Sequence, residues 1–289
     1  MIGSMIPLAP ALLSLLLFGP ALVAQDKTDA SEAKHVGTPV GLVRVATDDE
    51  AKQHMATLKK HVLPASAKNK KALKKKKKKK KSKKVPKQEA DTGLVTRLEA
   101  VEALQELQHK SFVKPLLVIM EFDPSLAVQT KAAKAIQAQP KDQVVPAATK
   151  LLGDKDVLKK GTMAAPLIKL LAYYGAKQSQ WDKLYRNFEL MGANAQIVLC
   201  ESMAARKDYE GLPTLLRNLD PPAPANVDDP SNPPASYWEA RWKSWQAFKP
   251  SLQAALKVLL GRSFEKSKDA LKYIKSEGGL KKLQKKLHG

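Results

Sequence analysis

The sequence predicts an all-α protein, a short α-solenoid of helical hairpins with a helical cap at its C-terminal end. The first observation is a proline-centred block at residues 110–117 that is echoed at residues 141–148 and 207–216. Pro115 and Pro146 are 31 residues apart, a period typical of helical repeats. The second observation is that apolar residues recur at spacings of three and four, as on one face of an amphipathic helix. Repeats of this kind bury a continuous core only by stacking on their neighbours.

Helices are expected from about Thr92 onward, separated by turns at proline and glycine. Pro124, Pro140 and Gly153 are expected to end three of them, because proline and glycine interrupt a helical pattern. The apolar spacing predicts helices over residues 94–107, 112–120, 128–136, 144–152, 158–174, 181–190, 195–205 and 209–219.

Residues 92–219 resemble the HEAT-repeat family. The residues that carry the resemblance are 97–104 and 130–136, together with the helices that contain Pro115, Pro146 and Pro213. HEAT-like proteins are mainly scaffolds and adaptors, so the resemblance implies a non-enzymatic protein that binds a protein partner through its repeat surface.

A proline-rich loop at residues 220–236 leads to a C-terminal helical module at residues 237–289. Trp238, Trp242 and Trp245 stand at i, i+4 and i+7 and share one helical face. Aromatic residues at this spacing are usually core, and a sugar-binding platform is the alternative. Trp181, Tyr185 and Phe188 repeat the spacing within the array.

Three further helical segments are expected in this module. One covers residues 251–260, one covers residues 267–276, and the last places four lysines around Leu280, Leu283 and Leu287. We expect the last helix to be a soluble cap on the array, with contact to a membrane surface as the alternative.

The N-terminal residues 1–24 have the pattern of a secretory signal peptide. An apolar run at residues 11–18 is followed by Gly19, Pro20 and small residues up to Ala24. This predicts export to the periplasm or secretion, with cleavage after Ala24. The alternative is an uncleaved N-terminal membrane anchor, because residues 5–24 carry no charge and are long enough to span a bilayer.

Residues 25–91 are expected to form a mostly disordered, lysine-rich tether. The chain has a formal net charge of +22, and 14 lysines lie between residues 68 and 87, without which the excess falls to +8. A block of like charges repels itself and stays solvated. One short helix is expected over residues 47–62, beginning at Thr47 and stable only if it docks on the array.

The lysine run is the candidate anion-binding segment. Without interleaved aromatic residues it has no base-stacking platform, so sequence-specific nucleic-acid binding is not expected. An anionic membrane surface or another polyanion is the expected partner, and a solvated spacer is the alternative. The candidate residues are Lys74, Lys75, Lys76, Lys77, Lys78, Lys79, Lys80, Lys81, Lys83 and Lys84.

No motif predicts an enzyme, a cofactor or a metal. The sequence contains no phosphate loop, nucleophile elbow or zinc-binding pattern. His54 and His61 lack a convincing third metal ligand, and Cys200, the one cysteine, is expected to be a buried apolar residue. The sequence therefore predicts an exported scaffold that binds a protein partner. The alternatives are a polyanion-binding protein acting through the lysine run, and a sugar-binding protein acting through the tryptophans.

Overall fold

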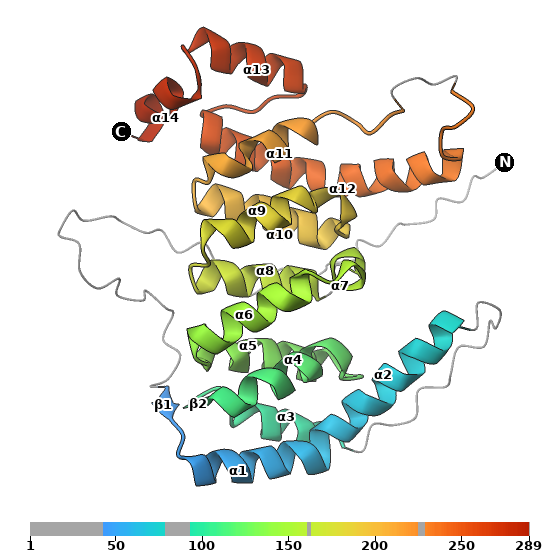
Figure 1. Cartoon of the computed structure of the whole chain (residues 1–289), viewed down its shortest axis with the longest axis vertical. Coiled ribbons are helices and arrows are strands. Elements are labelled where there is room, and N and C mark those ends of the chain that lie inside the picture. The colour runs from blue at the N-terminus through green and yellow to red at the C-terminus, as the bar shows by residue number, and fades with distance from the viewer. Residues whose placement is uncertain (1–42, 79–92, 161–162, 225–228, 289) are drawn as a thin grey trace, which may run out of the picture. The chain divides into compact units, whose positions relative to one another are not determined.

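The computed structural model describes residues 43–78, 93–160, 163–224 and 229–288 (Figure 1). These residues are mostly helical, which confirms the all-α prediction. The predicted signal peptide lies outside the described residues, as do Lys79, Lys80, Lys81, Lys83 and Lys84. All described residues belong to a unit that extends from Pro39 to Gly289.

The N-terminal part of this unit contains more helix than the sequence predicts. It comprises strand β1 (Arg44–Val45), helix α1 (Asp48–Thr57), a π-helical turn (Leu58–Val62) and helix α2 (Leu63–Lys78). Helix α1 begins where predicted, because the Thr47 side chain accepts from the backbone of Glu50 while Glu50 accepts from the backbone of Thr47. The prediction of a mostly disordered tether over residues 25–91 is wrong for residues 63–78, which are helical.

The N-terminal helices dock onto the helices that follow. Leu58 and Val62 are fully buried, and the π-helical turn packs against α3 (Leu94–Glu102). Asn69 of α2 donates a hydrogen bond to the carbonyl of Phe122 at 2.9 Å, and the Lys70 ammonium lies 4.5 Å from the centre of the Phe122 ring. Docking supplies the tertiary contacts that an isolated short helix lacks in water.

A short parallel pairing adds a second attachment. Strand β1 pairs with β2 (Leu107–Gln108), a strand in the connection between α3 and α4. The predicted helix over residues 94–107 ends at Glu102, and the chain then turns into β2. Beside this pairing, Nε2 of His109 lies 3.1 Å from a carboxylate oxygen of Asp48.

The central part of the chain is a succession of helices that pack in chain order. Contacts join α3 to α5, α4 to α6, α6 to α8, α8 to α10 and α10 to α12 (Ala235–Leu260). A continuous row therefore runs from α4 through α6, α8 and α10 to α12, in which each helix packs against the next. The helices are α3 (Leu94–Glu102), α4 (Val113–Phe122), α5 (Leu126–Ala135), α6 (Lys141–Leu152), α7 (Lys155–Lys160), α8 (Ala164–Tyr173), α9 (Gln178–Arg186), α10 (Ala193–Ala205) and α11 (Leu212–Arg217).

The recurring prolines have a local explanation. Pro115 and Pro213 lie in the first turns of α4 and α11, where a missing backbone N–H breaks no helical hydrogen bond. Pro146 is the exception, because it lies inside α6. The repeated block in the sequence therefore marks the starts of two helices and the interior of a third.

The C-terminal module contains α12 (Ala235–Leu260), α13 (Ser267–Ser276) and α14 (Leu280–His288). The helix predicted to carry Trp238, Trp242 and Trp245 and the one predicted over residues 251–260 form a single helix of 26 residues that contains Pro250. Gly261 ends α12 in the left-handed conformation, at φ 78°. Leu283 of α14 is fully buried, so this helix packs its apolar side inward. Within the described segments, no helix has both the length and the apolar content to cross a membrane.

Candidate functional site

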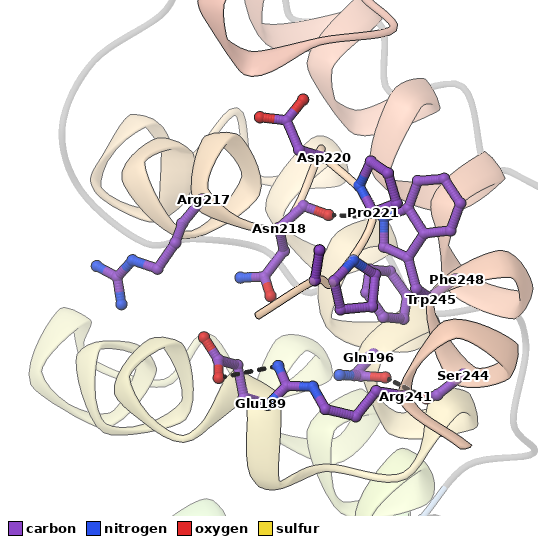
Figure 2. Close-up of a pocket in the computed structure, with 12 residues that line it drawn as sticks. Glu189, Gln196, Arg217, Asn218, Asp220, Pro221, Arg241, Ser244, Trp245 and Phe248 are labelled. Carbon is purple, nitrogen blue, oxygen red and sulfur yellow. Dashed lines mark hydrogen bonds and ion pairs between the residues drawn. The ribbon is translucent and has the colours of Figure 1, made fainter. Parts of the chain in front are cut away.

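A pocket of about 230 Å³ lies between α10, α11 and α12 (Figure 2). Gln196 comes from α10, and Arg217 and Asn218 come from the end of α11. The N-terminal half of α12 supplies Arg241 and Trp245. The remaining lining residues are Glu189, Asp220, Pro221, Pro222, Ala223, Ser244 and Phe248.

Packing between aromatic rings fixes the base of the pocket. Phe248 is the first buried side chain of α12, and its ring meets Phe188 edge to face with 5.3 Å between centroids. The Trp245 indole N–H donates to the carbonyl of Asn218 at 3.2 Å. This bond satisfies a backbone acceptor just beyond α11, where the helix itself offers no donor.

The loop after α11 is also held in place. Asp220 accepts hydrogen bonds from the backbone N–H of Ser267, at 3.1 Å, and from the hydroxyl of Ser267. These bonds tie the start of the proline-rich loop to the first residue of α13. The wall formed by Asp220 and Pro221 is therefore anchored to the C-terminal module.

Most polar groups of the pocket are paired with each other. Arg241 forms an ion pair with Glu189 at 3.1 Å and donates to the hydroxyl of Tyr237 at 3.1 Å. The hydrogen bond to Tyr237 and the carboxylate of Glu189 together raise the pKa of Arg241, so its charge is permanent. Gln196 donates to the carbonyl of Phe188 at 3.0 Å and accepts from the hydroxyl of Ser244 at 3.2 Å.

Arg217 differs from the other charged residues of the pocket. Its side chain is exposed, and among the described residues it has no ion-pair partner. Figure 2 shows the guanidinium of Arg217 turned away from Trp245, toward the outer side of the pocket. The pocket thus offers a charged group for a bound carboxylate, but it contains no paired nucleophile and base of the kind that acyl or phosphoryl transfer needs.

The N-terminal half of α12 exposes aromatic side chains beside the pocket. Trp242 is 48% exposed and Tyr237 is 42% exposed, whereas Trp238 and Trp245 are half-buried. The prediction that Trp238, Trp242 and Trp245 belong to the core is therefore wrong for Trp242. The physical reason is that α12 begins 13 residues before its first buried side chain, Phe248, so its first turns lack a helix that covers them.

The matching aromatic set of the array is core, as predicted. Trp181 is fully buried, and Tyr185 and Phe188 are nearly so. The guanidinium of Arg206 lies 3.9 Å from the centre of the Trp181 ring. The same spacing of aromatics thus gives a buried cluster in α9 and the turn after it, but in α12 it leaves Trp242 exposed and Trp238 and Trp245 half-buried.

The predicted anion-binding lysines fall into two groups, one at the end of α2 and one outside the described residues. Lys74, Lys75, Lys76, Lys77 and Lys78 form the last residues of this helix, and the other five lie outside the described residues. Leu73, directly before the run, is 41% exposed.

The structure also shows the surroundings of the cysteine and of one of the two histidines considered as metal ligands. Cys200 is fully buried, as predicted, and burial raises the pKa of its thiol. His54 meets the ring of Phe112 edge to face, with 6.3 Å between centroids. No cluster of metal-ligating side chains occurs among the described residues.

Comparison of the chain with protein-family models, with curated proteins and with solved structures finds no match. The HEAT-like nature of residues 92–219 therefore stays a prediction. The geometry of the pocket and the exposed face of α12 are the basis for a functional proposal.

Proposed function

We propose that this protein is a non-enzymatic scaffold that binds a protein partner beside the N-terminal half of α12. The observation that carries the proposal is the exposure of Trp242 and Tyr237 next to Arg241. Trp, Tyr and Arg are the residue types that dominate the binding energy of protein interfaces. The helices behind this surface, packed in chain order, support a HEAT-like α-solenoid as the scaffold.

The pocket provides polar groups next to the N-terminal half of α12. Arg217 presents an exposed guanidinium that has no ion-pair partner among the described residues, and the Asn218 amide keeps its side-chain oxygen as an acceptor while its nitrogen donates to Thr214 at 2.9 Å. A partner segment with a carboxylate and an exposed backbone N–H satisfies both groups. The aromatic residues supply the apolar contact area, and the polar groups of the pocket fix the orientation of the bound segment.

The proposal places the partner outside the cytosol, because residues 1–24 predict export. Sequencing the N-terminus of the mature protein tests this part. Cleavage after Ala24 is the expected result, and an intact N-terminus in a membrane fraction supports the anchored alternative instead.

The binding test uses the full-length protein as bait for partners from the extracytosolic fraction, followed by affinity measurement with the captured protein. Replacing Trp242 with alanine is expected to weaken binding about 30-fold, since loss of an interface hot spot costs about 2 kcal/mol. Tyr173→Ala is the matched control, because Tyr173 is 42% exposed and lies on α8. Equal affinities for wild type and Trp242→Ala, with unchanged melting temperatures, would contradict the proposal.

The exposure of Trp242 also favours a second candidate, a sugar-binding surface. A pyranose ring stacks on an aromatic face that is accessible to solvent, which Trp242 offers and Trp181 does not. Titration with oligosaccharides separates the two candidates. Saturable sugar binding that Trp242→Ala abolishes without unfolding the chain supports the sugar-binding surface.

A third candidate is polyanion binding through the lysine run that follows Leu73. Deleting residues 68–87 is unsuitable as a test, because it removes the Asn69 and Lys70 contacts to Phe122. Replacing Lys74–Lys81 with glutamine keeps the chain length and these contacts. Binding through many lysines falls steeply with salt, whereas docking at α12 falls less. An unchanged polyanion affinity in this variant excludes the run as the site.

A further inference from the structure

The two last helices of the chain form a surface that the scaffold proposal does not use. Ala270 of α13 and Leu283 of α14 are fully buried. Leu287 packs so closely on the end of α12 that a Cβ at Gly261 would lie 3.0 Å from its Cδ2. The apolar sides of both helices are therefore occupied by the core. What α13 and α14 can bind therefore depends on the residues of their outer sides.

The outer sides of α13 and α14 are strongly basic. Between residues 266 and 288 there are eight lysines and only two acids, Asp269 and Glu277. Glu277 is already paired with Lys286 at 2.8 Å. The other lysines are exposed and have no ion-pair partner within the described part of the chain; they are Lys266, Lys268, Lys272, Lys275, Lys281, Lys282 and Lys285.

An exposed leucine lies within this basic surface. Leu271 of α13 is 54% exposed. On a helix its side chain neighbours those three and four residues away, among them Lys268 and Lys275, and Lys272 follows it directly. Leu271 therefore adds an apolar group to a surface that is otherwise basic.

We propose that the outer surface of α13 and α14 binds an anionic lipid membrane. Lysine ammonium groups contact negatively charged headgroups while their aliphatic stems lie along the interface. Leu271 enters the boundary between headgroups and acyl chains, as apolar residues of interfacial helices do. Nucleic-acid backbones offer the same negative charge but no apolar layer for this leucine, so the lipid surface fits both observations.

This surface is separate from the aromatic face of α12 and from the lysine run of α2. The α12 face carries its aromatic residues at the opposite end of that helix from Gly261, where Leu287 packs. Failure of the scaffold proposal therefore leaves this one intact. It is also distinct from the run after Leu73, because its lysines lie on and beside α13 and α14.

The test measures binding of the full-length protein to phosphatidylcholine vesicles with and without phosphatidylserine. The variant replaces Lys268, Lys272 and Lys275 with glutamine. Each lysine near an anionic bilayer contributes about fivefold to partitioning, so the triple variant is expected to bind on the order of 100-fold more weakly. The matched control replaces three exposed lysines elsewhere, Lys155, Lys159 and Lys183, and is expected to bind like the wild type.

Two further variants decide the class of partner. Arginine in place of the same three lysines keeps the charge and is expected to preserve binding, which separates loss of charge from loss of folding. Leu271→Ala is expected to weaken binding to vesicles but not to duplex DNA. Three results would overturn the proposal: equal binding of the glutamine triple variant and its control, no dependence on phosphatidylserine, or an unchanged vesicle affinity for Leu271→Ala alongside strong DNA binding.

Discussion

Asp208 is expected to be among the most costly polar residues to remove from this fold. Its side chain is almost fully buried and accepts from the hydroxyl of Tyr185, from Gln178 at 3.4 Å and from the backbone N–H of Glu210 at 3.0 Å. It also forms an ion pair with Arg206 at 2.9 Å. Burial, and then the Asp208 carboxylate, raises the pKa of Tyr185, so the phenol stays protonated and continues to donate.

The size of the effect follows from what remains when the carboxylate is absent. Breaking a buried charge pair costs about 3–5 kcal/mol. Arg206 is 26% exposed, so water partly hydrates its guanidinium, and the lower end of that range applies. We expect Asp208→Ala to lower the free energy of unfolding by about 3 kcal/mol. At 2–4 °C for each kcal/mol in a chain of this size, the melting temperature falls by roughly 6–12 °C.

The assay is urea unfolding monitored by tryptophan fluorescence, because Trp181 lies under Arg206. Tyr185→Phe is the matched variant, since it removes one hydrogen bond to Asp208 and keeps the ion pair. Its expected cost is about 1 kcal/mol. If Asp208→Ala lowers the free energy of unfolding less than Tyr185→Phe does, Asp208 is not the centre of this network.

Three further outcomes are expected. Cys200 should react with a thiol reagent only at the rate of unfolding, because it is fully buried and its thiol pKa is raised; rapid labelling of the native protein would contradict this. Gly261→Ala should cost about 1–2 kcal/mol in thermal unfolding, because the added Cβ is strained at φ 78° and meets Leu287; an unchanged melting temperature would argue against the left-handed cap. Glu50 has a pKa lowered from 4.5 to about 2, first by its hydrogen bond with Arg44, so its stabilisation of α1 is complete above about pH 4.5 and is lost as pH falls toward 2. Hydrogen exchange of α1 amides measures this loss, and Glu50→Gln should remove it.

The central helices were predictable because their signal is local. The spacing of Trp181, Tyr185 and Phe188 predicts a buried face, and the structure confirms it. Thr47 followed by acids predicts the start of α1, which the capping box confirms. These features depend on residues within a few turns of each other, so the sequence alone contains the information.

The structure differs from the sequence-based predictions where contacts between residues far apart in the chain decide the fold. Helix α2 has a lysine-rich sequence with little apolar periodicity, and it is held by contacts to Phe122, 53 residues beyond Asn69. Strand β1 exists only because β2 lies beside it. For the candidate site, the sequence predicted the shared face of the three tryptophans but not that Trp242 would be uncovered. That depends on how far α12 extends beyond the helices it packs on.

The long-range docking of the N-terminal helices has a consequence for the order of folding during synthesis. Asn69 meets its acceptor only after a further 53 residues have been added to the chain. At about 5–20 residues per second, this interval is roughly 3–10 s on the ribosome. Leu58 and Val62 lie in the π-helical turn that packs against α3, and α3 is itself synthesised within this interval. The first helices in the chain therefore complete their docking only after residues 94–122 have been made, and until then the nascent chain presents an apolar segment on which a chaperone can act.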